Sequence, residues 1–138
     1  MPEENTLARA NAFRREAYLF SDDLDAGVGR SYVLPFDRDG TLERLYVRFY
    51  PGARLRLTLK PQIFRSDRRE RVVALRGKPS LSGENDVLDL KVSIPVYKDD
   101  SFVLDAANID PDGPHSFLCF VEVDYAGGAF PRGSVTNA

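Results

Sequence analysis

The sequence has few of the residues from which most catalytic and metal-binding sites are built. It contains one cysteine, one histidine, one methionine and no tryptophan among 138 residues. A single cysteine excludes an internal disulfide framework and multi-cysteine zinc or iron–sulfur sites, and a single histidine excludes the common multi-histidine metal sites. We therefore expect a protein that is not an enzyme and that carries no cofactor.

Long apolar runs and a large net charge are also missing. No segment approaches the roughly 18 apolar residues that a membrane helix needs, and the first residues, Met-Pro-Glu-Glu-Asn, are acidic and polar, unlike a signal peptide. The content of hydrophobic residues (43%) and charged residues (29%) is typical of a globular protein, and the length suits one domain. We expect no membrane partner and a chain made without export.

Apolar residues recur mainly with a period of two, in short segments bounded by Gly, Pro, Asp or Asn. This pattern predicts about eight strands, at 13–20, 30–36, 42–50, 54–64, 71–75, 87–96, 101–107 and 115–125. Alternation of apolar and polar residues favours antiparallel sheets, because strands of parallel sheets are usually covered on both faces. The sequence therefore predicts an all-β fold, an antiparallel two-sheet β-sandwich.

The jelly-roll type of sandwich is favoured over the immunoglobulin type, whose tryptophan and cysteine pair are absent. We expect one sandwich domain at 13–125. The segment 1–12 is predicted to form an N-terminal arm or short helix, and the Gly-rich, aperiodic segment 126–138 a flexible tail.

The segment Leu42–Lys60 is predicted to be a β-hairpin with Pro51-Gly52 at its turn. Alternation places one set of residues on an apolar face that must be covered: Leu45, Val47, Phe49, Leu55, Leu57 and Leu59. The opposite face carries the candidate partner-binding residues: Arg44, Tyr46, Arg48, Tyr50, Arg54 and Arg56.

Charge is distributed unevenly along the chain. Residues 38–76 hold eleven basic and four acidic side chains, a net +7, whereas residues 77–138 hold four basic and ten acidic ones, a net −6. The Arg/Tyr face suits contact with a protein surface or stacking on nucleic acid, or it is a solvated outer face. Nucleic acid is not an expected partner, because a dedicated binder would rarely carry so many acids on its other half. Opposite charges on two regions of one chain also suit copies that pack together.

Three sets of residues are candidates for chemistry. Asn108, Asp110 and Asp112 match the first half of a calcium loop, but Cys119 stands where the bidentate Glu is needed, so an Asx-rich turn is the simpler interpretation. Cys119 falls on the apolar side of its strand and is predicted to be a buried structural thiol. The acidic clusters at Asp22–Asp25 and Asp99–Asp100 could act as paired carboxylates only if they meet in the fold.

The stretch Gly83–Tyr125 resembles the closing half of small jelly-roll proteins of virions. The pattern is Ser-Gly-Glu-Asn-Asp before a strand, Lys-Asp-Asp before a second strand, a short Asp-rich loop, and a strand ending in Val-Glu-Val-Asp-Tyr. It is similar to head-decoration and other accessory capsid proteins of tailed phages. The resemblance implies a non-enzymatic structural protein of the virion, assembled in the host cytoplasm, whose partners are other copies of itself and a capsid or other protein assembly. The alternative is a carbohydrate- or ligand-binding β-sandwich module with Tyr46 and Tyr50 as stacking platforms and calcium at Asn108 to Asp112.

Overall fold

The computed structural model describes residues 15–66, 68–72 and 80–125, and over these residues the backbone forms nine β-strands. They are β1 (Arg15–Leu24), β2 (Gly29–Pro35), β3 (Gly40–Phe49), β4 (Leu57–Phe64), β5 (Arg69–Arg71), β6 (Leu81–Ser82), β7 (Val87–Val96), β8 (Ser101–Asn108) and β9 (His115–Asp124). The arm expected at 1–12 and the tail expected at 126–138 lie outside the described residues, as does most of the strand expected at 71–75.

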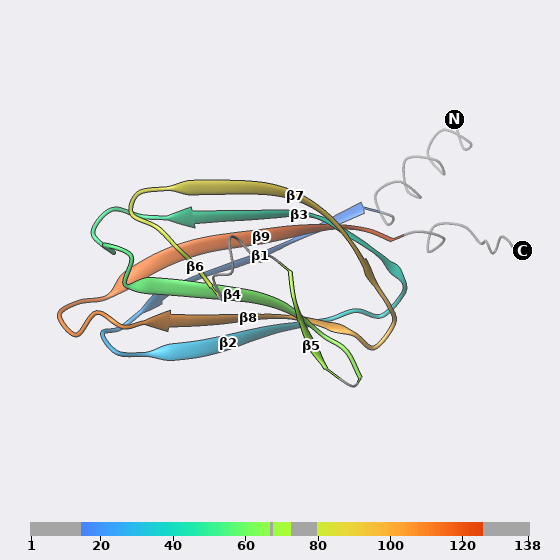
Figure 1. Ribbon diagram of the computed structural model, residues 1–138, viewed down its shortest axis with the longest axis horizontal. Coiled ribbons are helices and arrows are strands. Elements are labelled where there is room, and N and C mark those ends of the chain that lie inside the picture. The colour runs from blue at the N-terminus through green and yellow to red at the C-terminus, as the bar shows by residue number, and fades with distance from the viewer. Residues whose placement is uncertain (1–14, 67, 73–79, 126–138) are drawn as a thin grey trace, which may run out of the picture.

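The chain folds as one long hairpin whose two halves pair in nested order. β1 pairs with β9, β2 with β8, β3 with β7, and β4 with both β5 and β6, all antiparallel. Rolling up this hairpin brings β3 beside β9 and β4 beside β8. One sheet then has the order β1-β9-β3-β7, and the other has β2-β8-β4-β5 with β6 also paired to β4 (Figure 1). This nesting is that of a jelly-roll sandwich and confirms the predicted fold class.

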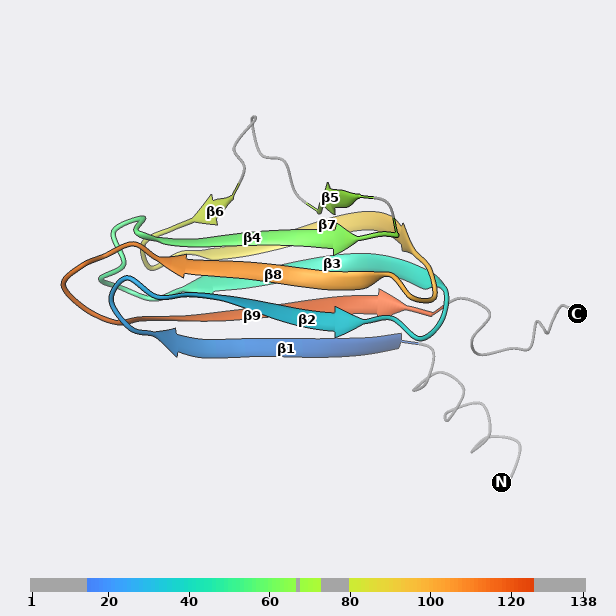
Figure 2. The ribbon, with the colours of Figure 1, turned by 90° about the horizontal axis from the view of Figure 1, so that it is seen from below.

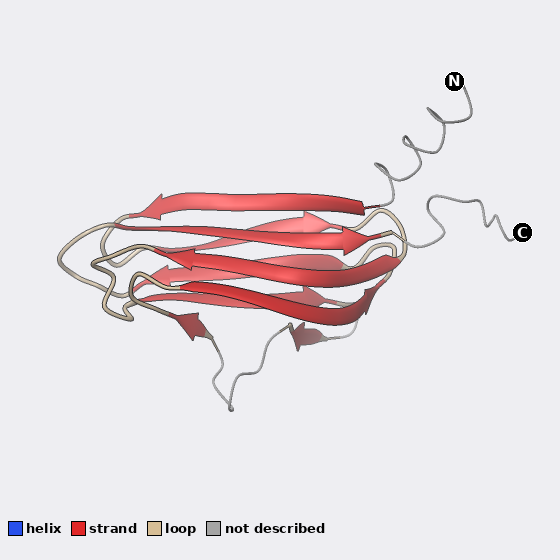
Figure 3. Ribbon diagram, turned by 90° about the horizontal axis from the view of Figure 1, so that it is seen from above, coloured by secondary structure: helices blue, strands red, loops and turns tan. Residues whose placement is uncertain are grey.

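The two sheets form two layers joined by loops at the ends of the strands (Figure 3). β7 occupies Val87–Val96, the span that alternation predicted for it. In the described part of the chain there is no helix with the length and apolar character needed to cross a bilayer.

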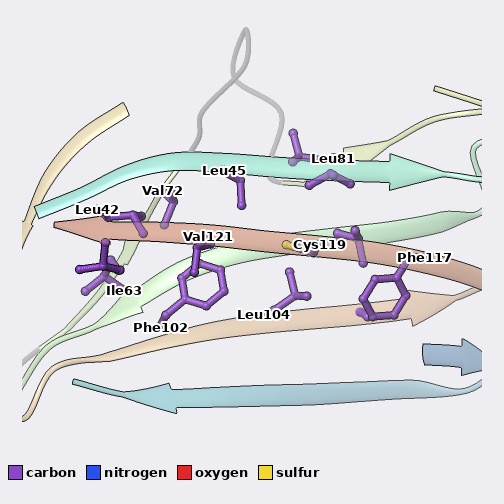
Figure 4. Packing of buried hydrophobic residues seen from close by; sticks show 14 of the residues in the cluster. Leu42, Leu45, Ile63, Val72, Leu81, Phe102, Leu104, Phe117, Cys119 and Val121 are labelled. Atoms are coloured by element: carbon purple, nitrogen blue, oxygen red, sulfur yellow. The ribbon is translucent and has the colours of Figure 1, made fainter. Parts of the chain in front are cut away.

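The core lies between the sheets and is filled from both inner faces. β9 contributes every second residue, among them Phe117, Cys119 and Val121, and β8 contributes Phe102 and Leu104 from the opposite sheet (Figure 4). All five are at most 1% exposed. Because successive side chains of a strand point to opposite faces, this burial leaves the intervening residues of β9 on the outer face.

The predicted hairpin between β3 and β4 is wrong. The two strands belong to different sheets, and the chain crosses from one sheet to the other through the Pro51-Gly52 turn. Gly52 has φ of 100°, and Arg54 and Leu55 follow with φ of 51° and 64°. Two successive left-handed residues turn the chain away from the pairing that a two-residue hairpin would give.

The apolar faces of β3 and β4 are nevertheless those predicted, with one exception. Leu45, Val47 and Phe49 on β3, and Leu57 and Leu59 on β4, have no exposed surface. They cover one another across the sandwich instead of lying side by side in one sheet. Leu55, which precedes β4 in the crossing segment, is 59% exposed, contrary to the prediction.

β1 lies against β2 along one flank of the sandwich (Figure 2), and polar side chains of these two strands bridge the sheets there. The Asp22 carboxylate on β1 accepts hydrogen bonds from Arg30 (2.8 Å) and from the Tyr32 hydroxyl (2.6 Å) on β2. These bonds, with that of Tyr32 the strongest influence, hold the pKa of Asp22 below its ordinary value. Farther along, the hydroxyls of Tyr18 and Tyr125 lie 2.6 Å apart. Hydrogen bonds therefore link β1 to β2 at this flank, together with the edge-to-face contact of the Phe20 and Tyr32 rings, whose centroids are 6.4 Å apart.

Candidate protein-contact surface

The six predicted partner-binding residues are divided between two places. Arg44, Tyr46 and Arg48 alternate along the outer face of β3, and Tyr50 follows this strand. Arg54 and Arg56 lie in the segment that crosses to β4, at the end of the sandwich. The predicted single Arg/Tyr face does not form, because β3 and β4 are in different sheets.

Arg44 is held by acidic side chains of both neighbouring strands. Its guanidinium donates two hydrogen bonds to Asp89 on β7 (2.8 and 2.9 Å) and one to Glu122 on β9 (3.4 Å). The bond from Arg44 holds the pKa of Asp89 below its ordinary value. The positive charge of Arg44 is therefore balanced by acidic side chains of its own chain.

Other arginines of the basic segment are paired in the same way. Arg56 contacts Asp110 (3.2 Å), Arg65 contacts Asp100 (2.8 Å) and Arg69 contacts Asp105 (3.5 Å). Nested pairing places the basic middle of the chain against its acidic C-terminal half. Part of the basic excess of residues 38–76 is therefore balanced by acidic side chains of the C-terminal half within one sandwich.

Apolar side chains line the outer face of the four-stranded sheet on β1, β9 and β3, and Val87 on β7 adds one more beyond Arg48, which stands opposite it. We call this set, Leu19, Tyr46, Val87, Leu118 and Phe120, the apolar stripe. Leu19 stands opposite Phe120, which in turn stands opposite Tyr46. The rings of Tyr46 and Phe120 meet edge to face with centroids 5.0 Å apart. Leu19 is 63% exposed and Val87 46% exposed.

Of the apolar stripe, only Tyr46 was among the sequence candidates. The signal for the others was present, because the inward positions of β9 leave Leu118 and Phe120 pointing outward. Two apolar residues on an outer face do not by themselves indicate a contact surface, because only the pairing of β9 with β1 and β3 places further apolar residues beside them. Arg48 stands between Leu118 on β9 and Val87 on β7, and its guanidinium is 5.0 Å from the centre of the Tyr50 ring.

A depression of about 690 Å³ opens beside Tyr50, at the end of the same face. It is lined by Ser21, Asp22, Asp23, Tyr50, Ser116 and Phe117. The Tyr50 ring is 36% exposed, and the Asp23 carboxylate accepts a hydrogen bond from the Ser116 hydroxyl. An aromatic ring beside hydroxyls and a carboxylate is a combination that can bind a small polar molecule.

The candidate calcium residues form a hydrogen-bonded turn. The Asn108 amide donates to the carbonyls of Leu24 (3.0 Å), Asp25 (3.2 Å) and Gly113 (2.9 Å). Its oxygen accepts from the backbone N–H of Asp110 at 3.0 Å, and Asp110 in turn accepts from the backbone of Asp112 at 2.9 Å. Asn108 therefore uses its side chain to join two loops, as the Asx-turn interpretation expects.

Cys119 and His115, the single cysteine and the single histidine of the sequence, lie in different surroundings. Cys119 is fully buried, as predicted, and burial raises the pKa of its thiol to about 12. His115 begins β9 and lies 2.7 Å from the Asp110 carboxylate, so its imidazole belongs to the turn.

The two acidic clusters lie at opposite ends of the sandwich. Asp25 is bound by Asn108, the last residue of β8, whereas Asp100 immediately precedes the first residue of that strand. The eight residues of β8 separate the two ends by roughly 25 Å at about 3.3 Å per residue. Paired carboxylates of glycosidases stand about 5–10 Å apart, so these clusters do not form such a pair.

Asp105 is the centre of a polar network on the outer face of the other sheet. Its carboxylate accepts hydrogen bonds from Ser31 (2.5 Å), Gln62 (2.8 Å) and Arg69 (3.5 Å). Burial by itself would raise the pKa of Asp105, but the bonds from Ser31 and Gln62 outweigh it, and the pKa is lowered.

We expect this network to make folding sensitive to acid. A carboxylate whose folded pKa lies below its unfolded value, about 3.9, stabilises the fold above that pH and loses its contribution as pH falls through the folded pKa. Urea unfolding between about pH 5 and pH 2 should therefore show a shallower pH dependence for Asp105→Asn than for the native chain. Ser31→Ala, which removes one of the bonds, should give an intermediate slope. Equal slopes for all three proteins would contradict this role of Asp105.

No protein-family model matches the sequence, and no curated protein matches it. Among solved structures, the chain is similar to the VP2 subviral particle protein of infectious bursal disease virus (TM-score 0.46, 11% identity, 84% of this chain and 34% of that chain). It is also similar to PliG, a periplasmic inhibitor of g-type lysozyme from Aeromonas hydrophila (TM-score 0.44, 8% identity, 82% and 90%). A third is a cupin protein from Bacteroides fragilis (TM-score 0.32, 18% identity, 80% and 67%). The chain spans about a third of the length of the VP2 chains.

These structural neighbours, which include viral capsid proteins and a cupin, are all distant. The fold is established by the strand pairing described above. What those proteins bind or assemble with is not carried over to this chain.

Proposed function

We propose that this chain is a non-enzymatic structural protein that acts by contact with other protein subunits, and that its assembly is a virion, in which it serves as a capsid decoration or accessory protein. The observation that supports contact is the apolar stripe. It places Tyr46, Leu118 and Phe120 on the two central strands of the sheet and Leu19 and Val87 on its edge strands. Arg48 stands between Leu118 and Val87, and the neighbouring Arg44 is already paired with Asp89. An apolar centre with a polar rim is the usual composition of a protein-binding surface.

The virion assignment has separate support. The stretch Gly83–Tyr125 resembles phage head-decoration proteins, and in the structure it supplies β7, β8 and β9 of a jelly roll. Such a protein would assemble on its capsid in the host cytoplasm. Nucleic acid is not proposed as a partner, because acidic side chains of the chain itself contact Arg44, Arg56, Arg65 and Arg69.

A binding assay on capsid shells tests the proposal. Genes for a capsid, portal or terminase protein should neighbour the coding sequence, and the capsid protein from that locus gives the shells. Val87→Asp places a charge in the apolar stripe and should weaken shell binding about thirtyfold or more, which corresponds to about 2 kcal/mol. Phe64→Asp is the matched control, because Phe64 is also 46% exposed but lies on the other sheet.

Two outcomes would count against the proposal. A locus without virion genes would remove the virion assignment. Equal binding by both variants and the native chain would show that the apolar stripe is not the contact surface.

The depression beside Tyr50 favours a second candidate function, a module that binds carbohydrate. Sugars stack on aromatic rings and bond to carboxylates and hydroxyls, and Tyr50, Asp23 and Ser116 offer these groups in one place. A glycan array should then show binding that Tyr50→Ala abolishes and that Tyr97→Ala keeps, because Tyr97 is 52% exposed outside this depression. An array without binding would exclude this candidate.

A further inference from the structure

β1 is an edge strand of the four-stranded sheet. Within the described residues it pairs with β9 alone, in an unbroken register from Arg15 opposite Asp124 to Leu24 opposite His115. Its other side presents backbone N–H and C=O groups along ten residues, without a bulge. Such an edge is a template for pairing with another strand unless the sequence protects it.

The other long edges carry protection that β1 lacks. β7 contains Pro95 and Lys91, and β2 has only seven residues and ends at Pro35. Proline and lysine are the residues that commonly prevent pairing at sheet edges. The middle of β1 is instead the uncharged segment Ala17–Ser21, which contains no proline or glycine.

Charges stand only at the two ends of β1, and on the outer face they have opposite signs. Arg15 lies four residues before Leu19 and Asp23 four residues after it, so all three point to the same face. If a second copy of β1 paired antiparallel about a two-fold axis at Leu19, Arg15 of each copy would stand opposite Asp23 of the other. The Arg15 side chain is 59% exposed, although it already contacts Glu43 at 3.2 Å and Asp124 at 3.7 Å.

The remaining residue pairs of this register are compatible with it. Ala17 would face Ser21, and on the inner side Tyr18 would face Phe20, an aromatic pair across strands. Glu16 would face Asp22, two like charges. Each of these acids is already bound by a cation of its own chain, Glu16 by Arg38 at 3.0 Å and Asp22 by Arg30 at 2.8 Å.

The apolar stripe would also continue across the axis. Leu19 is 63% exposed at the edge and stands opposite Phe120 on its inner neighbour, β9. With a second copy in place, Leu19 would meet Leu19 of that copy. The row Tyr46, Phe120, Leu19 would then continue into Leu19, Phe120 and Tyr46 of the second copy. Directly opposite side chains of an antiparallel pair contact one another, so both leucines would lose exposed surface.

We propose that a second copy of this chain pairs with β1, antiparallel and centred on Leu19, and joins the two four-stranded sheets into one eight-stranded sheet. This dimer deepens the proposed function, because it identifies the partner of one edge of the contact surface. An isologous contact of this kind is self-complementary, so a single charge change alters two contacts at once.

Charge reversal tests the register. Light scattering on the full chain should give twice the 15.5 kDa mass of one chain. Arg15→Asp turns two attractive contacts into two repulsive ones and should weaken the dimer about tenfold or more, and Asp23→Arg should do the same. The double variant restores both contacts with exchanged signs and should recover most of the affinity. Loss of the intrachain contacts of Arg15 alone could not produce this recovery.

Cysteine cross-linking tests the position of the axis. Leu19→Cys should form a disulfide-linked dimer under mild oxidation, because the two copies of position 19 would lie directly opposite each other. The native Cys119 is fully buried and should not react. Val33→Cys is the matched control, because Val33 is 59% exposed on the other edge strand, β2. Chains with Ala17→Cys should cross-link to chains with Ser21→Cys in a mixture, but not to themselves.

Three results would overturn the dimer: a monomeric mass at all concentrations, a double reversal as weak as the single ones, or equal cross-linking at positions 19 and 33. They are distinguishable from failure of the proposed function. Dimerisation is measured on the isolated chain, whereas shell binding is measured with Val87→Asp, on β7 at the opposite edge of the sheet. Shell binding without a dimer, or the reverse, would separate the two.

Discussion

Asn108→Asp should destabilise the fold by about 3 kcal/mol, although it exchanges one atom group for another of the same size. Asn108 is 1% exposed. Its side-chain amide donates to the carbonyls of Leu24 and Asp25, where β1 ends, and of Gly113, in the turn before β9. A carboxylate has no donor for these carbonyls and would place a negative charge against their oxygens. Urea unfolding at pH 7 measures the loss.

The same substitution separates a structural role from a calcium-binding role. In a calcium loop a carboxylate at this position would keep or strengthen binding, and added calcium would raise the melting temperature. We expect the opposite, a lower melting temperature that calcium does not restore. Asp112→Asn is the control, because Asp112 is exposed in the same turn and its change should cost less than about 0.5 kcal/mol. Calcium-dependent recovery of the Asn108→Asp variant would show that the loop is a metal site after all.

The strands could be predicted because burial of one face of a strand produces a local alternation of apolar and polar residues in the sequence. In β7, Leu88, Leu90, Val92 and Ile94 alternate with polar residues, and the observed strand, Val87–Val96, contains the whole of this alternation. The same pattern placed Cys119 in the core. Neither inference needs to know which strand lies alongside, so both could be made from a single stretch of sequence.

Strand partners could not be predicted in this way. Pro51-Gly52 has the composition of a turn whether the next strand returns alongside β3 or crosses to the other sheet. The crossing depends on left-handed backbone angles at Arg54 and Leu55. These residue types rarely adopt such angles, and no local sequence pattern indicates them. Because a hairpin turn and a crossing turn have the same composition, the pattern predicts Arg54 and Arg56 on a face on which they do not lie.

The ion pairs could not be predicted for the same reason. Arg44 and Asp89 are 45 residues apart in the sequence, and only the pairing of β3 with β7 brings them to 2.8 Å. Segment totals therefore overstated how much charge the surface offers. The apolar stripe was missed for the same reason, because its residues come from four strands that no short window of sequence contains.

Arg65→Leu should cost about 3 kcal/mol of stability, the usual effect of breaking a buried ion pair from one side. The guanidinium of Arg65 is enclosed, with its side chain 12% exposed, and donates to Asp100 (2.8 Å), to Glu70 (2.7 Å) and to the carbonyl of Pro95 (2.9 Å). It thereby ties the segment between β4 and β5 to the turn between β7 and β8, on the flank opposite the bridges between β1 and β2. Leucine would leave the Asp100 carboxylate, itself 11% exposed, without its cation.

Arg69 is a matched control that shows whether burial of the ion pair determines the loss of stability. Arg69 also contacts a carboxylate, Asp105, but at 3.5 Å and with its side chain 51% exposed, so Arg69→Leu should cost less than about 1 kcal/mol. Combining Arg65→Leu with Asp100→Asn removes both charges, and the double variant should be more stable than the sum of the two single losses predicts. Equal costs for Arg65→Leu and Arg69→Leu in urea unfolding would show that the ion pair at Arg65 does not hold this flank together. A large cost with no coupling to Asp100 would point instead to the bonds that Arg65 makes with Glu70 and Pro95.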